Sequence, residues 1–267
     1  MPEGDTIHTL ALALSRGLIG HRLIAVRVRG RHQPHLAGRR IAAVTSRGKH
    51  LFIDLDDGLS LRSHLGLHGS WHHYARAEPW QRPGRQASLV LEVEDRVYVC
   101  FSAREVELMR TQGLRTQDLR DRLGPDLTRE PCDPDRIWNR ALELLPGDTL
   151  IVDLLLDQRI AAGIGNIYKS EVLFVTRRSP LARLHDLPPR DFQELYRTAG
   201  GLLNGNLTGG PRRTRPQGDG RGLLWVYGRA TRPCLVCSTP VSRARLGVNP
   251  RSTYWCPACQ AAAPAGM

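Results

Sequence analysis

The sequence predicts a multidomain α+β protein: a leading helix, an antiparallel β-sandwich or barrel, a helical domain and a small cysteine-rich segment. Three observations predict this fold class. Between about residues 22 and 108, apolar residues recur at every second position, which is the pattern of half-buried strands. From about residue 115 the apolar spacing becomes helical, and the segment 223–260 carries two Cys-x-x-Cys pairs. At 267 residues, the chain is long enough for more than one core.

The leading helix is predicted over residues 5–17. Its apolar side chains fall at helical spacing on one face: Ile7, Leu10, Ala11 and Leu14. Acidic and hydroxyl side chains stand at the start of the segment and Gly17 follows the apolar stripe, as is typical of helix ends.

Directly before this helix stands the tetrapeptide Met-Pro-Glu-Gly, residues 1–4. Removal of Met1 would give Pro2 a free secondary amine, and an α-amino group with a pKa near ~8 has a neutral fraction at physiological pH. The positive end of the following helix favours the uncharged amine further. Such an amine can attack a sugar C1′ to form an iminium, with Glu3 as a general acid. Taken alone, the tetrapeptide is better explained as an ordinary start of translation.

Three segments show the strand pattern most clearly. In 23–30, apolar side chains share one face while arginines take the other. Segment 51–65 has an Asp-Gly turn at 57–58 and segment 88–103 turns near Asp95, so each is predicted to form a hairpin. Closely spaced strands of this kind favour an antiparallel sandwich or barrel.

The second half of the chain is predicted to be helical. Segments with helix-length apolar spacing, bounded by Gly or Pro, are 133–145, 148–158, 166–175 and 189–205. The polar stretch 205–222, rich in Gly, Pro and Arg, is interpreted as a loop or linker.

A turn within 154–174 joins two of these helices and holds Gly163 and Gly165, with Asn166 opening the second helix. Free N–H groups and the positive dipole end gather at such a helix start, which suits a phosphate. An ordinary helical hairpin with a capping Asn explains the same pattern, and on this segment alone it is the better explanation.

The two cysteine pairs are separated by 18 residues: Cys234, Cys237, Cys256 and Cys259. Each Cys-x-x-Cys turn presents two thiolates, and the intervening 239–254 suits a β-hairpin, so the spacing predicts one structural zinc ion. Four protein ligands leave no open position for catalysis. The alternatives are disulfides or a redox pair, but Cys100 and Cys132 stand alone, which favours a reduced protein. Arg245 and Arg251 fall near the hairpin tip, where they could meet phosphate.

The charge balance indicates a polyanion as partner. There are 38 Lys and Arg against 26 Asp and Glu, a formal net charge of +12. A solvated basic surface without a partner is the alternative. Only Lys49 and Lys169 are lysines, and codon bias in a GC-rich genome is one explanation of the arginine excess. Position 49, the one lysine in the arginine-rich first half of the sequence, is nevertheless predicted to need a compact ammonium. The sequence shows neither a membrane-length apolar run nor a signal pattern, and we expect a cytoplasmic protein without membrane contact.

Taken together, these segments resemble the Fpg/Nei (formamidopyrimidine-DNA glycosylase/endonuclease VIII) family. The matching motifs cover most of the chain: MPEG at 1–4, SRGKHLF at 46–52, SHLGLHGSW at 63–71, LGPDL at 123–127, LLLDQRIAAGIGNIY at 154–168, VYGR at 226–229 and CLVC…YWCPACQ at 234–260. The resemblance implies an N-terminal β-sandwich catalytic domain at 1–114, a helix-two-turn-helix DNA-binding domain at 115–222 and a zinc-finger domain at 223–267. It also implies a DNA-repair enzyme of base excision repair, a bifunctional DNA glycosylase and abasic-site lyase.

By the same resemblance, Pro2 is the Schiff-base nucleophile and Glu3 the proton donor. Lys49 would serve β-elimination and hold a phosphate, and Arg251 resembles the residue linked to δ-elimination. The implied partner is double-stranded DNA with an oxidised base or abasic site. We expect a monomer, associated with the nucleoid, that needs no small-molecule cofactor.

Further positions match DNA-contacting residues of the family. Asn166 and Arg122 fall where the family contacts the DNA backbone. A base must leave the stack before C1′ is attacked, and Leu67 and His68 match the loop that fills the vacated space. Ordinary packing at a strand end explains these last two equally well.

Two departures affect the expected substrate. Position 6 is Thr where many members have Glu, and Gly66 replaces the Gln wedge of endonuclease VIII. The opening MPEGD, the SHLxL…W segment and the shorter loop at 209–225 favour the endonuclease VIII branch, and so oxidised pyrimidines. The alternatives are oxidised-purine specificity and a catalytically inactive DNA-binding relative.

Overall fold

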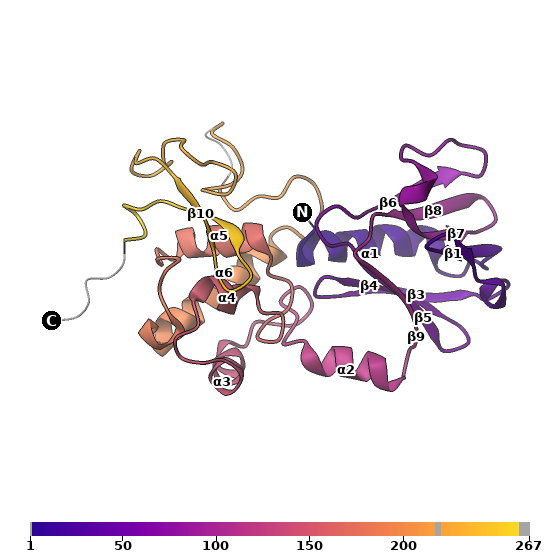
Figure 1. The fold of residues 1–267 in the computed structure, drawn as a ribbon, viewed down its shortest axis with the longest axis horizontal. Helices are drawn as coiled ribbons and strands as arrows, with labels where there is room; N and C mark the ends of the chain where they lie inside the picture. Colours follow the sequence, from indigo (N-terminus) through magenta and orange to yellow (C-terminus); the bar gives the residue numbers. More distant parts are fainter. Residues whose placement is uncertain (1, 217–219, 262–267) are drawn as a thin grey trace. The chain divides into compact units, whose positions relative to one another are not determined.

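The computed structural model describes residues 2–216 and 220–261. The chain divides into two compact units, Met1–Arg122 and Leu123–Met267 (Figure 1). None of the helices in the described part of the chain has the length and apolar character to cross a membrane.

The first unit is a β-sandwich with a leading helix. Its elements are α1 (Gly4–Leu18), β1 (Ala25–Val28), β2 (Arg31–His32), η1 (Pro34–Leu36), β3 (Ile41–Arg47), β4 (His50–Leu55), β5 (Leu59–His64), β6 (Ser70–Ala75), η2 (Gly84–Gln86), β7 (Ala87–Glu92), β8 (Arg96–Phe101), β9 (Glu105–Arg110) and α2 (Leu114–Arg122). One sheet has the strand order β2-β1-β7-β8-β6 and the other β3-β4-β5-β9, with antiparallel pairing in both. The sandwich predicted from the period-two pattern is therefore confirmed, and a closed barrel is not formed.

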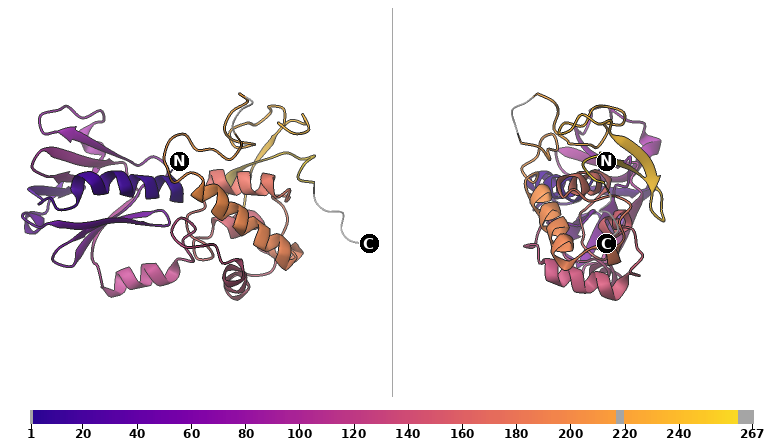
Figure 2. Two further views of the ribbon diagram at one scale, coloured as in Figure 1. Left: turned by 180° about the vertical axis from the view of Figure 1, so that it is seen from behind. Right: turned by 90° about the vertical axis from the view of Figure 1, so that its left-hand side faces the viewer.

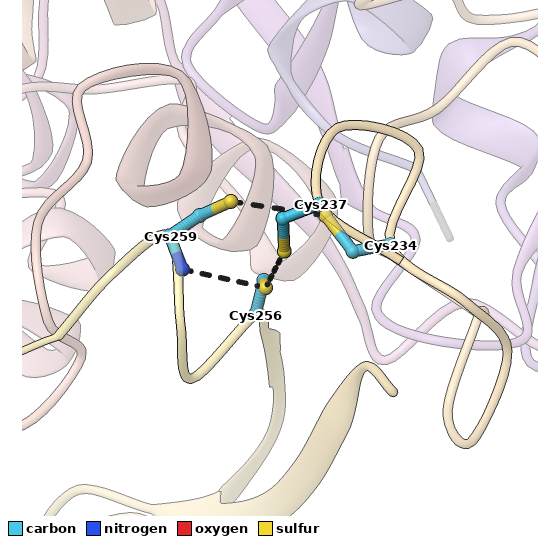
Figure 3. Close-up of side chains that lie close together, drawn as sticks. All are labelled: Cys234, Cys237, Cys256 and Cys259. Atoms are coloured by element: carbon cyan, nitrogen blue, oxygen red, sulfur yellow. Dashed lines mark hydrogen bonds between the residues drawn. The ribbon is translucent and has the colours of Figure 1, made fainter. Parts of the chain in front are cut away.

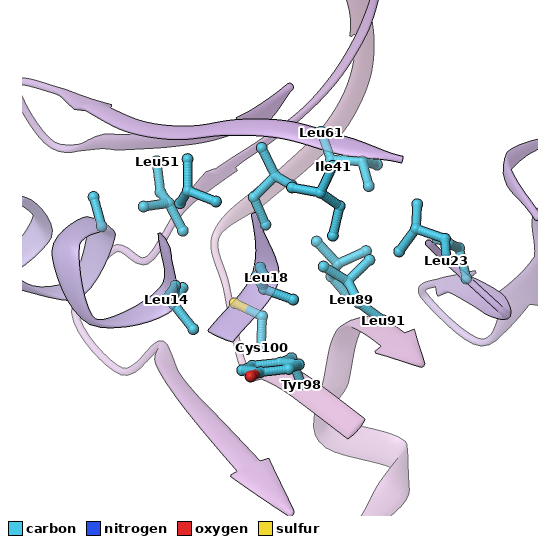
Figure 4. Packing of buried hydrophobic residues seen from close by; sticks show 14 of the residues in the cluster. Leu14, Leu18, Leu23, Ile41, Leu51, Leu61, Leu89, Leu91, Tyr98 and Cys100 are labelled. Atoms are coloured by element: carbon cyan, nitrogen blue, oxygen red, sulfur yellow. The ribbon is translucent and has the colours of Figure 1, made fainter. Parts of the chain in front are cut away.

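The core of this unit lies between the sheets and includes α1. Leu14 and Leu18 of α1 pack in one cluster with Leu51 from one sheet and Leu91 from the other (Figure 4). In the views of Figures 1 and 2, α1 runs along the sandwich with its N-terminus at one end. Since burial of each such side chain contributes about 1.5–3 kcal/mol, this packing fixes where the start of the helix lies.

The predicted helix end at Gly17 is wrong by one residue, because Gly17 lies inside α1 and the helix ends at Leu18. The reason is a tertiary contact. The Tyr98 hydroxyl donates to the Gly17 carbonyl at 2.9 Å, and a Cβ on residue 17 would lie 2.2 Å from the same hydroxyl. The glycine is thus needed for close approach, and its place near the helix end is incidental.

The second unit joins a helical domain to a two-stranded hairpin. Its elements are α3 (Pro134–Leu144), α4 (Ile151–Leu156), α5 (Asn166–Val175), η3 (Leu184–Asp186), α6 (Pro189–Asn204), β10 (Ser242–Leu246) and β11 (Arg251–Trp255). All four predicted helices are present. The one expected over 148–158 is shorter at both ends, because residues 146–149 form a turn closed by Thr149 N–H on Pro146 and the chain leaves the helix at Asp157.

The LGPDL motif at 123–127 packs against the turn between α4 and α5. Gly124 N–H donates to Gln158 O at 2.9 Å, and Ala162 N–H donates to Pro125 O at 2.9 Å. A Cβ on Gly124 would lie 2.3 Å from the Ile160 carbonyl oxygen. The motif therefore braces the backbone of the turn that precedes α5.

Candidate functional site

Pro2 and Glu3 lie at the N-terminal end of α1. Glu3 is the N-cap residue, extended at φ −125° and ψ −174°, and its carbonyl accepts the Ile7 N–H at 3.0 Å. Pro2 is half-buried and the Glu3 side chain is fully buried. Met1 lies outside the described residues. Both residues thus stand at the positive end of a 15-residue helix.

Lys49 stands in the two-residue turn between β3 and β4, next to the last strand pair, Arg47 with His50. Gly48 has a φ of 53°, and a glycine at the first central position is what a type II′ hairpin turn requires. The lysine is half-buried. The Gly-Lys pair of the RGK motif is therefore a turn that presents the ammonium at one edge of the sandwich.

Arg62 of β5 ties together the strands beside Lys49. Its guanidinium donates to Glu105 at 2.9 Å and Glu107 at 2.8 Å on β9, and to Nδ1 of His50 on β4 at 2.9 Å. Burial lowers the pKa of His50 to about 3, with further contributions from His64, Arg62 and Lys49. His50 is therefore neutral at physiological pH, and lysine and arginine carry the positive charge of this region.

Burial also lowers the pKa of His64, the cross-strand partner of His50. The Lys49 and Arg104 charges act in the same direction, and Glu105 opposes them. The two histidine rings lie 4.9 Å apart between centroids. A charged His64 would therefore add repulsion to a site that already holds several cations.

The loop between β5 and β6 presents Leu67 and His68. Leu67 is 57% exposed and His68 is exposed, so strand-end packing does not bury either side chain. Gly69 N–H donates to Leu65 O at 3.1 Å, and a Cβ at residue 69 would lie 2.4 Å from that oxygen. Gly66 has a φ of 64°, and its Cβ would meet Arg104 Cβ at 2.9 Å. This tight turn accounts for glycine at position 66.

Arg122 is the last residue of α2 and is exposed. A cation at a helix C-terminus interacts favourably with the negative end of the dipole. Its side chain lies on the surface of the first unit. The predicted contact of Arg122 with the DNA backbone stays a prediction.

Asn166 begins α5 without capping it, because the N-cap residue is Gly165. The Asn166 Nδ2 group donates to Ser252 O of β11 at 2.7 Å, and its Oδ1 accepts from Lys169 Nζ at 2.8 Å. The interpretation of Asn166 as a capping residue is therefore wrong. Its side chain instead joins the start of α5 to the hairpin.

Arg251 is the exposed first residue of β11 and pairs with Leu246 of β10. The hairpin predicted within 239–254 is confirmed by β10 and β11. Asp153 of α4 accepts the Val248 N–H at 3.0 Å, so the hairpin tip is also held by the helical domain. Asn166 and Arg251 are thus brought to the same end of α5 and β11.

The four finger cysteines lie together and their geometry fits zinc (Figure 3). Their sulfur atoms all lie within 4.8 Å of one another, with 3.4 Å between Cys237 and Cys256 and 3.9 Å between Cys234 and Cys259. Sulfurs in a tetrahedral zinc site, with Zn–S of about 2.3 Å, lie roughly 3.8 Å apart. The thiol donor set suits zinc, and the six cysteines form no disulfide.

Comparison with known proteins agrees with this arrangement. Residues 1–112 match the formamidopyrimidine-DNA glycosylase N-terminal domain, residues 123–215 its H2TH domain, and residues 233–262 the zinc finger found in FPG and IleRS. A probable endonuclease 8 2 of Streptomyces coelicolor is 39% identical, over 98% of this chain and 94% of its own. The chain belongs to the Fpg/Nei family.

Other Fpg/Nei relatives match over nearly the full length of both chains. A DNA-(apurinic or apyrimidinic site) lyase Nei2 of Mycolicibacterium smegmatis is 36% identical, over 98% of this chain and 100% of its own. A formamidopyrimidine-DNA glycosylase of Thermus thermophilus is 33% identical, over 99% of this chain and 100% of its own. The predicted enzyme class, a DNA glycosylase and abasic-site lyase of base excision repair, is confirmed by this family membership.

Solved structures show the same Fpg fold. The Lactococcus lactis formamidopyrimidine DNA glycosylase, non-covalently bound to DNA containing an abasic site, superposes with a TM-score of 0.83 at 23% identity, over 98% of this chain and 100% of that one. A MutM structure in complex with DNA containing carbocyclic 8-oxoG gives the same TM-score at 24% identity, over 98% of this chain and 100% of that one. The predicted three-part fold is confirmed, and its zinc finger implies a bound zinc ion. The residue roles and the predicted boundaries at 114 and 222 stay predictions.

Two buried charged residues of α5 were not identified from the sequence. Lys169 and Glu171 are both fully buried and both bond to segments outside the helix. The composition could have indicated Lys169, because it is one of only two lysines in the sequence. Nothing in the local pattern distinguished Glu171 from a solvated helix residue.

Proposed function

We propose that this chain removes oxidised bases, preferably pyrimidines, from double-stranded DNA and cleaves the strand through a Schiff base on Pro2. The observation that carries the proposal is the pair Pro2 and Glu3 at the positive end of α1, with Glu3 fully buried. A buried carboxyl beside a secondary amine can give and take protons at one reacting carbon. The proposal concerns the chain after removal of Met1, because acylated proline nitrogen cannot form an iminium.

The chemistry begins at C1′ of the damaged nucleotide. The Pro2 nitrogen attacks C1′, the glycosidic bond breaks, and its electron pair leaves with the base, which takes up a proton. The Glu3 carboxylate takes the proton that the attacking nitrogen loses and passes it to the ring oxygen, so the sugar opens and an iminium forms between Pro2 and C1′. Loss of the acidified C2′ proton then expels the 3′ phosphate by β-elimination. Water hydrolyses the iminium and restores the amine.

Lys49 is assigned to the elimination step and to a phosphate. Lys49 lies in a tight turn next to His50, which is neutral at physiological pH. The lysine ammonium is therefore the cation that this turn offers to a phosphate, with no charged imidazole beside it. A phosphate leaving from the sugar would be stabilised by such an ammonium. Arg251 is assigned to a phosphate and to δ-elimination, supported by its exposure at the start of β11.

Base flipping costs a few kcal/mol, which contacts with the distorted duplex must offset. We assign the vacated space in the stack to Leu67 and His68, supported by the exposure of both side chains on a tight turn. Asn166 and Arg122 are assigned to the DNA backbone. One zinc ion on the four cysteines is assigned a structural role, since all four protein ligands are thiols and leave no open position.

The enzyme is further proposed to act as a monomer in the cytoplasm, at the nucleoid where its substrate lies. Oxidised-purine specificity is the second candidate, since a formamidopyrimidine-DNA glycosylase is among the relatives. Cleavage rates on oligonucleotides with dihydrouracil, 8-oxoguanine or an abasic site decide between them. Faster release of 8-oxoguanine than of dihydrouracil would overturn the pyrimidine preference.

The Schiff base is tested by borohydride reduction in the presence of abasic or thymine-glycol DNA. The wild-type chain is expected to give a covalent protein–DNA adduct, and Pro2→Gly is expected to lose most strand cleavage while keeping one zinc per chain. If the wild-type chain binds DNA but never forms the adduct, the protein is a DNA-binding module without this catalytic activity. Unchanged cleavage by Pro2→Gly would refute the role of the terminal amine.

A further inference from the structure

Lys169 of α5 is a buried ammonium in the second unit. It is one of two lysines among 38 basic residues, and its side chain is fully buried on α5. An ammonium loses strong hydration on burial, so it is retained only where it is hydrogen-bonded. The acceptors that surround it therefore indicate what the residue does.

Those acceptors come from two elements. Lys169 Nζ lies 2.8 Å from Asn166 Oδ1 on α5, 2.8 Å from Thr253 Oγ1 on β11 and 3.5 Å from Ser252 O. An ammonium has three donors and no acceptor. The Asn166 atom that faces it must therefore be the oxygen, which directs the Nδ2 group to Ser252 O at 2.7 Å.

The contact with Thr253 extends to Arg251. Because the Thr253 hydroxyl accepts from the ammonium, its own proton is left to donate to the Arg251 carbonyl, 3.2 Å away. Thr253 is itself fully buried. Lys169 thus reaches Asn166 directly and the backbone of Arg251 through one hydroxyl.

We propose that Lys169 is a positioning residue that holds Asn166 and Arg251 in a fixed relation for binding the DNA backbone. The proposal rests on the proposed function, which assigns both residues to DNA. Lys169 does not itself touch the substrate. A compact ammonium with three rotatable donors suits three acceptors around one point, which the planar fork of arginine does not.

The test measures the Kd for a duplex with a tetrahydrofuran abasic-site analogue, as a function of salt, for Lys169→Met. The side chain keeps its length and loses its donors. The Kd at low salt is expected to rise about tenfold, and the salt dependence to become shallower by about one unit of slope, because a misplaced Arg251 no longer releases a counterion. Zinc per chain and Tm are measured on the same samples.

A matched control separates positioning from simple docking of the hairpin. Asp153→Ala removes the bond to Val248 N–H at the hairpin tip and touches neither Asn166 nor Thr253. It is expected to lower Tm. The Kd should stay within about twofold of wild type, and the slope of the salt dependence within about half a unit. If both variants weaken binding equally, Lys169 only docks the hairpin and the proposal is wrong.

A double-mutant cycle gives the second criterion. If Lys169 acts through Asn166, Lys169→Met should weaken binding less in an Asn166→Ala background than in the wild type. Fully additive effects would contradict this. Should Lys169→Met fail to fold, Thr253→Val keeps the ammonium and removes one acceptor. It is expected to raise the Kd about threefold, roughly 0.7 kcal/mol, and an unchanged Kd would overturn the proposal.

The two proposals fail in different ways. Borohydride trapping of the wild-type chain decides the Schiff-base chemistry and does not involve Lys169. The Kd comparison decides the positioning role and holds even for a chain that binds DNA without cleaving it.

Discussion

Replacing Glu171 by Gln should loosen the segment that leads into the zinc finger. The fully buried carboxylate of Glu171 accepts four hydrogen bonds. Oε1 accepts the N–H groups of Val226 at 2.9 Å and Tyr227 at 2.8 Å. Oε2 accepts the Trp225 N–H at 2.7 Å and the Thr214 hydroxyl. One side chain thus joins Thr214 to the backbone of residues 225–227.

The cost of Glu171→Gln follows from counting donors. With the amide oxygen at the Oε1 position, two bonds survive in weaker, uncharged form. The amide NH₂ then faces Trp225 N–H and Thr214; the hydroxyl can turn to accept, but the Trp225 N–H has no acceptor. A buried unpaired donor costs about 1–3 kcal/mol, and each charged bond that becomes neutral loses about 1 kcal/mol. Relief from burying a carboxylate offsets part of this.

The net destabilisation expected is about 2–4 kcal/mol, which for a chain of this size is a fall in Tm of roughly 4–16 °C. Thermal unfolding measures it, and amide hydrogen exchange locates it, since the N–H groups of Trp225, Val226 and Tyr227 should exchange faster. Glu194→Gln is the control. Its partner Arg178 lies 3.9 Å away and Glu194 is 55% exposed, so about 0.5 kcal/mol or less is expected. A Tm for Glu171→Gln within about 2 °C of wild type would show that the buried carboxylate does not hold this segment.

Three further predictions concern glycine packing, pH and zinc. Gly124→Ala should destabilise by about 2 kcal/mol, because its Cβ would lie 2.3 Å from the Ile160 carbonyl. Gly201 lies in α6, and a Cβ added there would have nothing within 4 Å. Gly201→Ala should therefore stabilise the protein by about 0.5–1 kcal/mol, measured by thermal unfolding as for Gly124→Ala. His50, with its pKa lowered to about 3, is neutral in both states above pH ~6.5; below that only the unfolded chain gains its proton. The contribution of His50 to the free energy of unfolding should therefore fall by about 1.4 kcal/mol per pH unit towards pH 3. Stability should fall less steeply in His50→Gln than in the wild type, and parallel pH profiles would contradict this. Cys237→Ser should lower bound zinc per chain and loosen the finger, seen by metal analysis and unfolding; full zinc occupancy would argue against its role as a ligand.

The fold class could be predicted because each part of the chain carries its own local signal. The period-two strands, the helical spacing and the paired cysteines are independent signals, and the structure contains the elements that each of them predicts. Helix ends were harder, because tertiary contacts decide them. Gly17 was interpreted as a signal for the end of the helix. Glycine is instead required there because the Tyr98 hydroxyl leaves no room for a Cβ at residue 17. A contact between residues so far apart has no local signature.

Asn166 illustrates the same limit at the candidate site. Its place at the start of α5 was predicted from the two glycines before it, and α5 does begin there. Its partner was not predicted, because Ser252 lies on β11, far along the chain. A side chain that could cap its own helix is instead used to bond another element, and only the docking of the hairpin makes that geometry available.

The charged residues of α5 show why the finger can be held on the helical domain at all. Read alone, the segment 166–175 places Lys169 and Glu171 where a solvated face is expected, yet the helix is buried from Asn166 to Phe174. The finger shares one small apolar cluster with α5, in which Phe174 of the helix packs with Val226, Cys234, Val241 and Cys256. So small a core cannot order a segment unaided, which is why such segments use metal ions. Lys169 bonds to β11 and Glu171 to the chain leading into the finger, so polar bonds from one helix supply the specificity that apolar burial lacks there. It follows that changes at these two residues should disturb the finger more than equal losses of apolar area elsewhere in the second unit.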